Sequence, residues 1–264
     1  MAKPLVSDEL WALIQPLLPP PKPRRFRYPG RKPLDDRQTL TGILFVLKTG
    51  IPWEDLPAEM NCGSGMTCWR RLQQWHQAGV WFQLHQVLLA KLDQAHQIDW
   101  SRAAVDSTFA RALGGVEESG PNPTDRGRPG LKQHLLVDAQ GIPLAGDSTP
   151  ANVAEVQEAL PLVETCGPLD ENGEPQHRPQ RLYGDRGYTS KELQEELRQR
   201  GIDPKLAQRY TEHGSGLGIF RWVVERSISW LHGFRKLRLV TEKTAEMQYA
   251  LFDLALAVIA FRFL

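Results

Sequence analysis

Residues 103–106 have the sequence Ala-Ala-Val-Asp and residues 181–185 have the sequence Arg-Leu-Tyr-Gly-Asp, so each short apolar run ends at an aspartate. Between them, residues 133–138 (Gln-His-Leu-Leu-Val-Asp) and residues 142–146 (Ile-Pro-Leu-Ala-Gly) predict two strands joined by a short turn. From Trp100 onward the apolar residues therefore follow the spacing of strands, whereas upstream they follow the spacing of helices.

Helical segments separate and follow these strands. The pattern predicts helices over residues 152–165 and 189–200, a fifth strand over residues 202–206, and closing helices over residues 220–234 and 244–263. The order is strand, strand, strand, helix, strand, helix, strand, helix. It predicts an α/β fold with a mixed sheet flanked by helices, and it matches the order of a ribonuclease H-like core.

The first part of the chain is predicted to be all-α. Apolar spacing predicts helices over residues 7–18, 35–48, 64–77 and 80–97. A linker over residues 19–33 interrupts them, because its prolines exclude regular structure. We therefore expect a helical region at residues 1–99, with a basic linker at 19–33, and an α/β domain at residues 100–264.

The composition is that of an ordinary globular protein. Of the 264 residues, 41% are apolar and 24% are charged, which excludes a collagen-like or disordered chain. The formal charge of +1 does not indicate a nucleic-acid partner, so such a partner must be argued from local clusters of charge. Three cysteines are too few for a disulfide framework and lack the spacing of a zinc site.

No targeting or membrane segment is evident. The first residues lack the apolar stretch of a signal peptide. The most apolar run, residues 250–264, contains Asp253 and Arg262 and falls short of the roughly 20 apolar residues of a membrane span. We expect a cytoplasmic protein with reduced thiols and no membrane association.

Asp106 and Asp185 are candidate metal ligands, because each ends a predicted strand and functional groups gather at strand ends in open α/β sheets. Two adjacent aspartates repel each other unless a divalent cation shares them, and Mg²⁺ prefers such oxygen ligands. Glu225, on the following helix, would complete a site for two metal ions about 3.5–4 Å apart. Alternatively, either aspartate could form a turn or cap a helix, and Glu225 could be a surface acid paired with Arg221.

Motifs along nearly the whole chain resemble those of a known family. The first part contributes residues 10–14 with 17–19, 30–33, 48–53 and 56–57. The second part contributes Val-Asp-Ser-Thr at 105–108, Gly-Arg-Pro-Gly at 127–130 with Lys132 and His134, Thr-Pro-Ala-Asn-Val at 149–153, Asp-Arg-Gly-Tyr at 185–188 and Trp-Val-Val-Glu-Arg at 222–226. In this order they resemble the bacterial insertion-sequence transposases of the DDE class, particularly the insertion-sequence-five group.

The resemblance implies that Asp106, Asp185 and Glu225 form a catalytic and metal-binding triad holding two Mg²⁺ ions, for which Mn²⁺ substitutes. Relatives often place a tyrosine three residues before the arginine of the glutamate helix and a lysine seven residues after the glutamate. Here these positions hold Gly218 and His232. We expect His232 to replace that lysine in part, and Arg235 and Lys236 to take over phosphate binding.

Three regions are candidates for contact with double-stranded DNA, which is held largely through phosphates. The linker offers arginines that could enter a minor groove: Arg24, Arg25, Arg27, Arg31 and Lys32. A segment resembling the recognition helix of a helix-turn-helix offers Thr67, Arg70, Arg71 and Gln74. The surroundings of the triad offer Arg126, Arg128, Lys132, His134, Arg186, Arg221, Arg226, His232, Arg235 and Lys236. The linker could instead be a solvated loop, the helix an ordinary bundle helix, and His134 a structural histidine.

The sequence therefore predicts a transposase that binds the terminal inverted repeats of its element, cleaves the ends and joins them to target DNA. We expect a homodimer, since two ends must be paired. Two alternatives stay open: a repressor-like DNA-binding protein without activity, and a metal-dependent nuclease that cuts but does not join.

Overall fold

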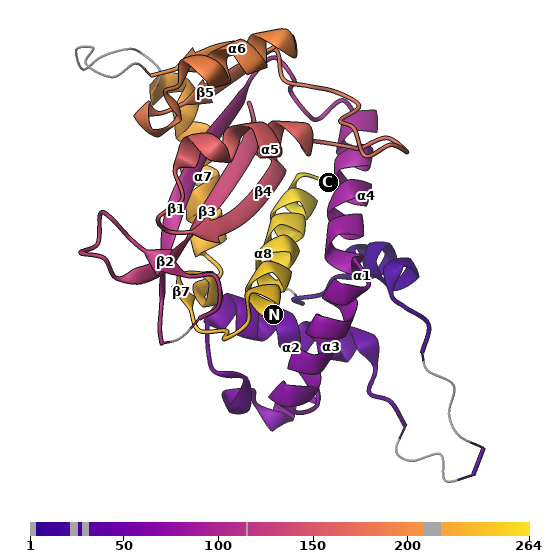
Figure 1. The fold of residues 1–264 in the computed structure, drawn as a ribbon. Helices are drawn as coiled ribbons and strands as arrows, with labels where there is room; N and C mark the ends of the chain where they lie inside the picture. Colours follow the sequence, from indigo (N-terminus) through magenta and orange to yellow (C-terminus); the bar gives the residue numbers. More distant parts are fainter. Residues whose placement is uncertain (1–3, 22–25, 28–31, 115, 208–217) are drawn as a thin grey trace.

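The computed structural model describes residues 4–21, 26–27, 32–114, 116–207 and 218–264 (Figure 1). Its first part is helical, with α1 (Asp8–Ile14), α2 (Asp36–Thr49), α3 (Gly65–Gln77) and α4 (Val80–Gln94). Side-chain oxygens cap three of these helices: Ser7 accepts from Leu10 N, Asp35 from Gln38 N and Ser64 from Thr67 N. These caps satisfy amide groups that have no partner within the helix, and they fix where each helix begins.

The second part contains a mixed sheet built around β1 (Ala103–Ala112). On one side β1 pairs antiparallel with β3 (Pro129–Asp138), which pairs antiparallel with β4 (Pro143–Pro150). On the other side β1 pairs parallel with β5 (Arg181–Gly184), which pairs parallel with β6 (Asp203–Leu206). Two short strands complete the sheet, β2 (Gly120–Pro121) beside β3 and β7 (Leu239–Val240) beside β1.

Four helices accompany the sheet: α5 (Ala159–Glu164), α6 (Lys191–Gln199), α7 (Gly218–His232) and α8 (Ala245–Ala260). The main elements follow each other as β1, β3, β4, α5, β5, α6, β6 and α7, and the main strands lie in the order β4-β3-β1-β5-β6. Three antiparallel strands followed by two parallel ones, with helices in the connections, is the arrangement predicted from the sequence. The predicted α/β, ribonuclease H-like fold class is confirmed.

Two of the differences from the prediction concern β1 and the segment that follows β4. β1 continues six residues beyond Asp106, so this aspartate lies inside the strand and not at its end. The predicted helix over residues 152–165 is reduced to a 3₁₀ turn (Glu155–Gln157) followed by the short α5. Pro161 lacks an amide hydrogen and is tolerated only in the first turn of a helix, which places the start of α5 at Ala159.

α8 joins the two parts of the molecule. It packs against α3 and α4 on one side and against β4 on the other, so in Figure 1 it runs between the sheet and α4. Most of its side chains are buried. One continuous hydrophobic core therefore extends from Val6 to Ala260 and crosses the domain boundary predicted at residue 100.

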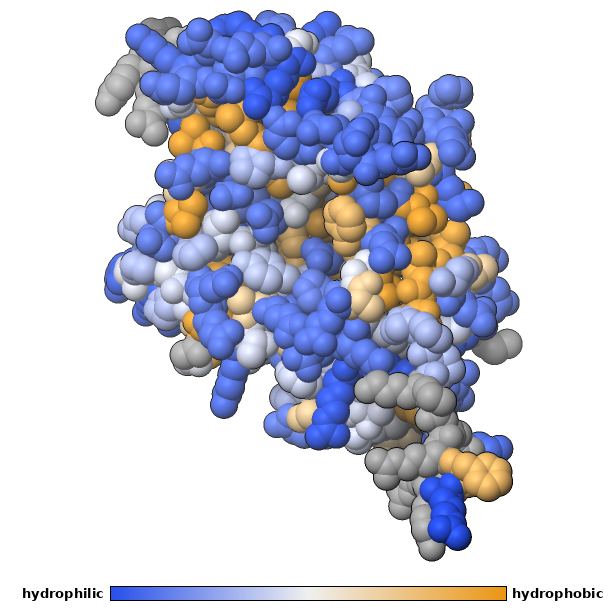
Figure 2. All heavy atoms as spheres, turned by 45° about the vertical axis from the view of Figure 1, so that its right-hand side comes forward, coloured by the Kyte–Doolittle hydropathy of each residue, from blue (hydrophilic) through white to orange (hydrophobic). Residues whose placement is uncertain are grey.

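The face of the molecule shown in Figure 2 is mostly hydrophilic, and apolar side chains appear on it in separate patches. Within the described ranges, no helix is both long enough and apolar enough to cross a membrane. The three cysteines are free and buried, and burial raises the pKa of each thiol. They are therefore structural apolar residues under ordinary conditions.

Candidate active site

Asp106 lies in β1, and Asp185 directly follows the neighbouring strand β5. The parallel pairing of β1 and β5 matches Ala103 with Leu182 and Ala104 with Tyr183. Continuing this register by two residues brings Asp106 beside Asp185, and neighbouring strands are about 4.8 Å apart. The negative charge of Asp185 also contributes to the raised pKa of Asp106, as expected for close carboxylates.

Asp106 has the environment of a functional carboxylate. Its Oδ1 accepts a hydrogen bond from Ser107 N at 2.8 Å, and its Oδ2 forms an ion pair with Arg221 Nη2 at 3.1 Å. Burial raises the pKa of Asp106 from its ordinary value to about 6, with smaller increases from the charges of Asp185 and Glu155. Ser107 and Arg221 oppose this rise but do not cancel it. A buried carboxylate beside a second one favours a cation that both can share.

Asp185 follows β5 directly, as predicted. Its Oδ1 accepts from Gly187 N at 2.8 Å and caps a 3₁₀ turn (Arg186–Tyr188). The turn-forming role that the sequence left open is therefore real, and it also fixes the orientation of this carboxylate. The carboxylate of Asp185 is half-buried.

Glu225 lies on α7, which packs against β1. Arg221, one turn earlier, reaches Asp106, and Nε2 of His232, two turns later, lies 3.1 Å from Thr108 Oγ1. With about 3.6 residues per turn, positions 221, 225 and 232 fall on one stripe of the helix. Glu225 therefore shares the stripe that faces β1, and its side chain is exposed.

Glu155 is a third carboxylate at the site that the sequence did not single out. Its Oε1 accepts from Ser107 Oγ at 2.8 Å and lies 3.7 Å from Lys132 Nζ. Its Oε2 adjoins Gly187, where a Cβ atom would overlap it. The signal that could have found it is its position, two residues after the Thr-Pro-Ala-Asn-Val motif at 149–153.

The donor set suits a hard divalent cation. Asp106, Asp185 and Glu155 offer carboxylate oxygens, and the buried hydroxyl of Tyr188 has no hydrogen-bond partner among the described residues. Burial and the charges of Asp106, Glu155 and Asp185 raise the pKa of this hydroxyl, which places it close to them. Within the described part of the chain, no three acidic, histidine or cysteine side chains already form a closed metal-binding group. The structure thus brings Asp106 and Asp185 together but does not gather Glu225 with them.

The predicted DNA contacts of the first part remain partly accessible. Arg24, Arg25 and Arg31 lie outside the described residues, whereas Arg27 and Lys32 are exposed. On α3, Arg70 and Gln74 are exposed and Thr67 is half-buried. Arg71 forms an ion pair with Asp36 on α2 and lies over the Trp75 ring, so its guanidinium already has partners in the protein.

The predicted DNA contacts around the catalytic residues include both exposed side chains and side chains that already have partners in the protein. Exposed positions are Arg126, Arg128, Arg186 and Arg235. Arg226 is half-buried, donates to Gln140 O, and stacks on the rings of Trp222 and Trp230. Arg221 is engaged with Asp106. Burial lowers the pKa of His232, which disfavours the positive charge of the lysine it was expected to replace.

Three predicted phosphate contacts, Lys132, His134 and Lys236, are buried and have partners within the protein. Lys132 donates to Val153 O at 2.7 Å and faces Glu155. His134 is fully buried, and its Nε2 lies 2.8 Å from Thr149 Oγ1, which supports the structural alternative. Lys236 forms an ion pair with Glu242 at 2.9 Å, with both side chains nearly inaccessible.

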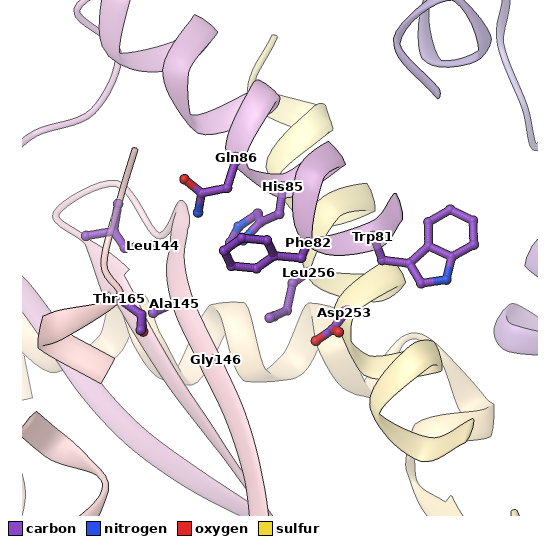
Figure 3. Close-up of a pocket in the computed structure, with 10 residues that line it drawn as sticks. All are labelled: Trp81, Phe82, His85, Gln86, Leu144, Ala145, Gly146, Thr165, Asp253 and Leu256. Atoms are coloured by element: carbon purple, nitrogen blue, oxygen red, sulfur yellow. The ribbon is translucent and has the colours of Figure 1, made fainter. Parts of the chain in front are cut away.

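A small cavity lies elsewhere, between α4, β4 and α8 (Figure 3). Its volume is about 60 Å³. Among its lining side chains are His85, whose Nε2 lies 2.9 Å from Pro143 O, and Asp253. None of the predicted catalytic residues lines it, so it is not part of the carboxylate site.

Comparison with known families identifies the class of protein. Residues 6–85 match the family profile of candidate transposases of the IS4/5 family. Residues 101–217 and residues 182–262 match two profiles of the transposase DDE domain. The first of these two spans both Asp106 and Asp185, and the second spans Glu225.

Two curated relatives come from Burkholderia cepacia. The chain is 66% identical over 123 residues to the uncharacterized 16.2 kDa protein of insertion element IS402, an alignment covering 47% of this chain and 84% of that protein. It is 49% identical over 146 residues to a candidate transposase for insertion sequence element IS402, an alignment covering 55% of this chain and 69% of that protein. The chain therefore belongs to the IS4/5 family of transposases and carries a DDE domain. The predicted resemblance is confirmed.

Among solved structures, a chain of a Mos1 transposase paired-end complex with the left transposon end aligns with 79% of this chain and 77% of its own length. The identity is 11% and the TM-score is 0.26.

Proposed function

We propose that this transposase cleaves the ends of its insertion sequence and joins the freed 3′ hydroxyls to target DNA, using Asp106, Asp185 and Glu225. The observation that carries the proposal is the parallel pairing of β1 with β5, whose register, continued by two residues, matches Asp106 with Asp185. Two adjacent carboxylates, one of them with a raised pKa, form a site that a divalent cation would stabilise. The match to the DDE domain supports the same residues.

In this proposal Asp106 and Asp185 hold the ions, and Glu225 approaches from the exposed stripe of α7. Bound Mg²⁺, or Mn²⁺ in its place, activates the attacking oxygen and stabilises the leaving oxygen. In the first step a water oxygen bonds to the phosphorus at the transposon end, and the bond to the 3′ oxygen breaks. In the second step the oxygen of that 3′ hydroxyl bonds to a phosphorus of the target, and the bond from this phosphorus to the target's own 3′ oxygen breaks. Arg221, on the stripe shared with Glu225, would pair with phosphate when a cation takes its place at Asp106.

DNA would lie across the exposed basic positions. Arg70 and Gln74 on α3 would contact one part of the transposon end, and Arg126, Arg128, Arg186 and Arg235 would contact backbone near the carboxylates. Two ends have to be held together for transposition, so the active species would be a homodimer.

The proposal is tested by a strand-transfer assay with purified protein, DNA carrying the ends of its element, a target plasmid and Mg²⁺ or Mn²⁺. We expect Asp185→Ala and Glu225→Gln to lower cleavage and joining by at least about 100-fold, because metal ligation contributes several kcal/mol at the transition state. Both variants should still bind the ends in a mobility-shift assay. The matched control is Asp203→Ala, which removes an exposed aspartate that pairs with Lys205 on β6. It should retain activity.

The products distinguish the alternatives. Cleavage without joined product would identify a nuclease. Binding without cleavage in either metal would leave a repressor-like protein and contradict the proposed activity.

A further inference from the structure

Glu155 occupies a position between the two strand segments that carry the catalytic aspartates. Through Oε1 it accepts from Ser107 Oγ at 2.8 Å, and the amide of Ser107 is bound to Asp106. Through Oε2 it adjoins Gly187, whose amide is bound to Asp185. One carboxylate therefore contacts the neighbour of each aspartate, and the turn that carries it packs on the turn after β5.

Lys132 offsets the charge of Glu155. Its ammonium lies 3.7 Å from Glu155 Oε1, and only 8% of its side chain is exposed. Its other partners are neutral: the carbonyl of Val153 at 2.7 Å and the ring of Phe109, with the ring centroid 5.2 Å away. Glu155 is thus the anion that compensates a buried cation, and a buried cation without one is strongly unfavourable.

We infer that Glu155 is a positioning residue that, together with Lys132, sets the divalent-cation affinity of the aspartate pair. The inference rests on the proposed metal site at Asp106 and Asp185. Glu155 holds the Asp106 strand and the Asp185 turn at a fixed separation, and it cancels a positive charge that would otherwise compete with the incoming cation. Groups that orient metal ligands in this way commonly change metal affinity by about 10- to 100-fold when they are substituted.

The test is a titration of the protein with Mn²⁺ in the absence of DNA. Binding is measured by calorimetry and, independently, by the electron paramagnetic resonance signal of free Mn²⁺. Glu155→Gln keeps an oxygen acceptor for Ser107 but removes the charge. We expect its Mn²⁺ dissociation constant to rise by about 10-fold or more. Lys132→Met removes the buried cation and should bind Mn²⁺ at least as tightly as the wild type. The double variant, with both charges removed, should recover most of the affinity lost in Glu155→Gln.

Glu158→Gln is the matched control, because it removes a carboxylate three residues further along whose pKa is raised by burial and, to a smaller extent, by the charge of Asp147. It should leave the Mn²⁺ affinity unchanged. The inference is overturned if Glu155→Gln binds like this control, or if the double variant stays as weak as Glu155→Gln, which would indicate direct ligation. If circular dichroism shows that Glu155→Gln does not fold, the single variant Lys132→Met serves as the test. A lower Mn²⁺ affinity of Lys132→Met than of the wild type would then contradict the inference.

Asp185→Ala separates this inference from the proposed function. If Asp185→Ala binds Mn²⁺ like the wild type, the proposed metal site itself is wrong. If Asp185→Ala loses binding while Glu155→Gln keeps it, only the role of Glu155 fails.

Discussion

His134 illustrates how burial of one residue changes the response to pH. Burial, with a smaller contribution from Lys132, lowers its pKa to about 3, whereas an unfolded histidine titrates near about 6.5. Between these values the unfolded chain binds more protons, so this residue's contribution to stability is lost as pH falls from about 6.5 towards 3. In urea unfolding, the stability difference between wild type and His134→Asn should therefore narrow on acidification, by on the order of 1 kcal/mol per pH unit. His96→Asn, at an exposed position, is the control, and a difference independent of pH for His134→Asn would contradict the prediction.

At the same scale, the sequence located residues whose position follows from a pattern, but it could not show the burial and the distant partners of others. Asp185 was placed correctly because an apolar strand ends just before it. Lys132 and Lys236 were assigned to phosphate because a sequence shows charge but not burial. Their carboxylate partners, Glu155 and Glu242, come from other segments, and only the fold brings them together. Whether Asp106, Asp185 and Glu225 act as a triad stays a prediction that the strand-transfer assay would test.

At the scale of elements, the order of strands and helices was predictable because it follows from the period of the apolar residues. The length of β1 was not, since the residues after Asp106 mix polar and apolar side chains without a clear apolar run and take their strand conformation from pairing with β3. The short strands β2 and β7 were missed for the same reason: each has only two residues and no pattern of its own.

The contact between β4 and α8 depends on a glycine. A Cβ atom at Gly146 would lie 2.7 Å from Leu256 Cδ1 and 3.1 Å from the Phe252 ring, both on α8. Gly146→Ala should therefore lower the free energy of unfolding by about 1–3 kcal/mol, the usual cost of overpacking a core. Chemical denaturation measures this, with Gly218→Ala as the control, because a Cβ there meets nothing within 4 Å. Equal stability of the two variants would show that α8 can shift away from β4.

For the whole molecule, the decisive feature is a buried junction between the first helices and the end of the chain. Glu242 accepts from Trp53 Nε1 at 2.9 Å and from Trp69 Nε1 at 3.1 Å, and it pairs with Lys236. Both indoles belong to the region predicted as a separate helical domain, whereas Glu242 and Lys236 belong to the other part. This junction and the continuous core predict that residues 1–99 and 100–264 unfold together.

Glu242→Gln tests that coupling. It leaves the Lys236 ammonium buried without a counter-charge, which should cost about 3–5 kcal/mol. Adding Lys236→Met should restore part of the loss, because the uncompensated charge is then gone.

Unfolding of the wild-type protein should show one transition, with tryptophan fluorescence and far-ultraviolet circular dichroism giving the same midpoint. If fluorescence and dichroism give separate transitions in the wild type, the two parts are independent domains. In that case the helical region and the α/β part would be connected only by a hinge. A single transition would instead indicate that α3 and the carboxylate site belong to one cooperative unit, in which the position of α3 on DNA fixes where the carboxylate site cuts.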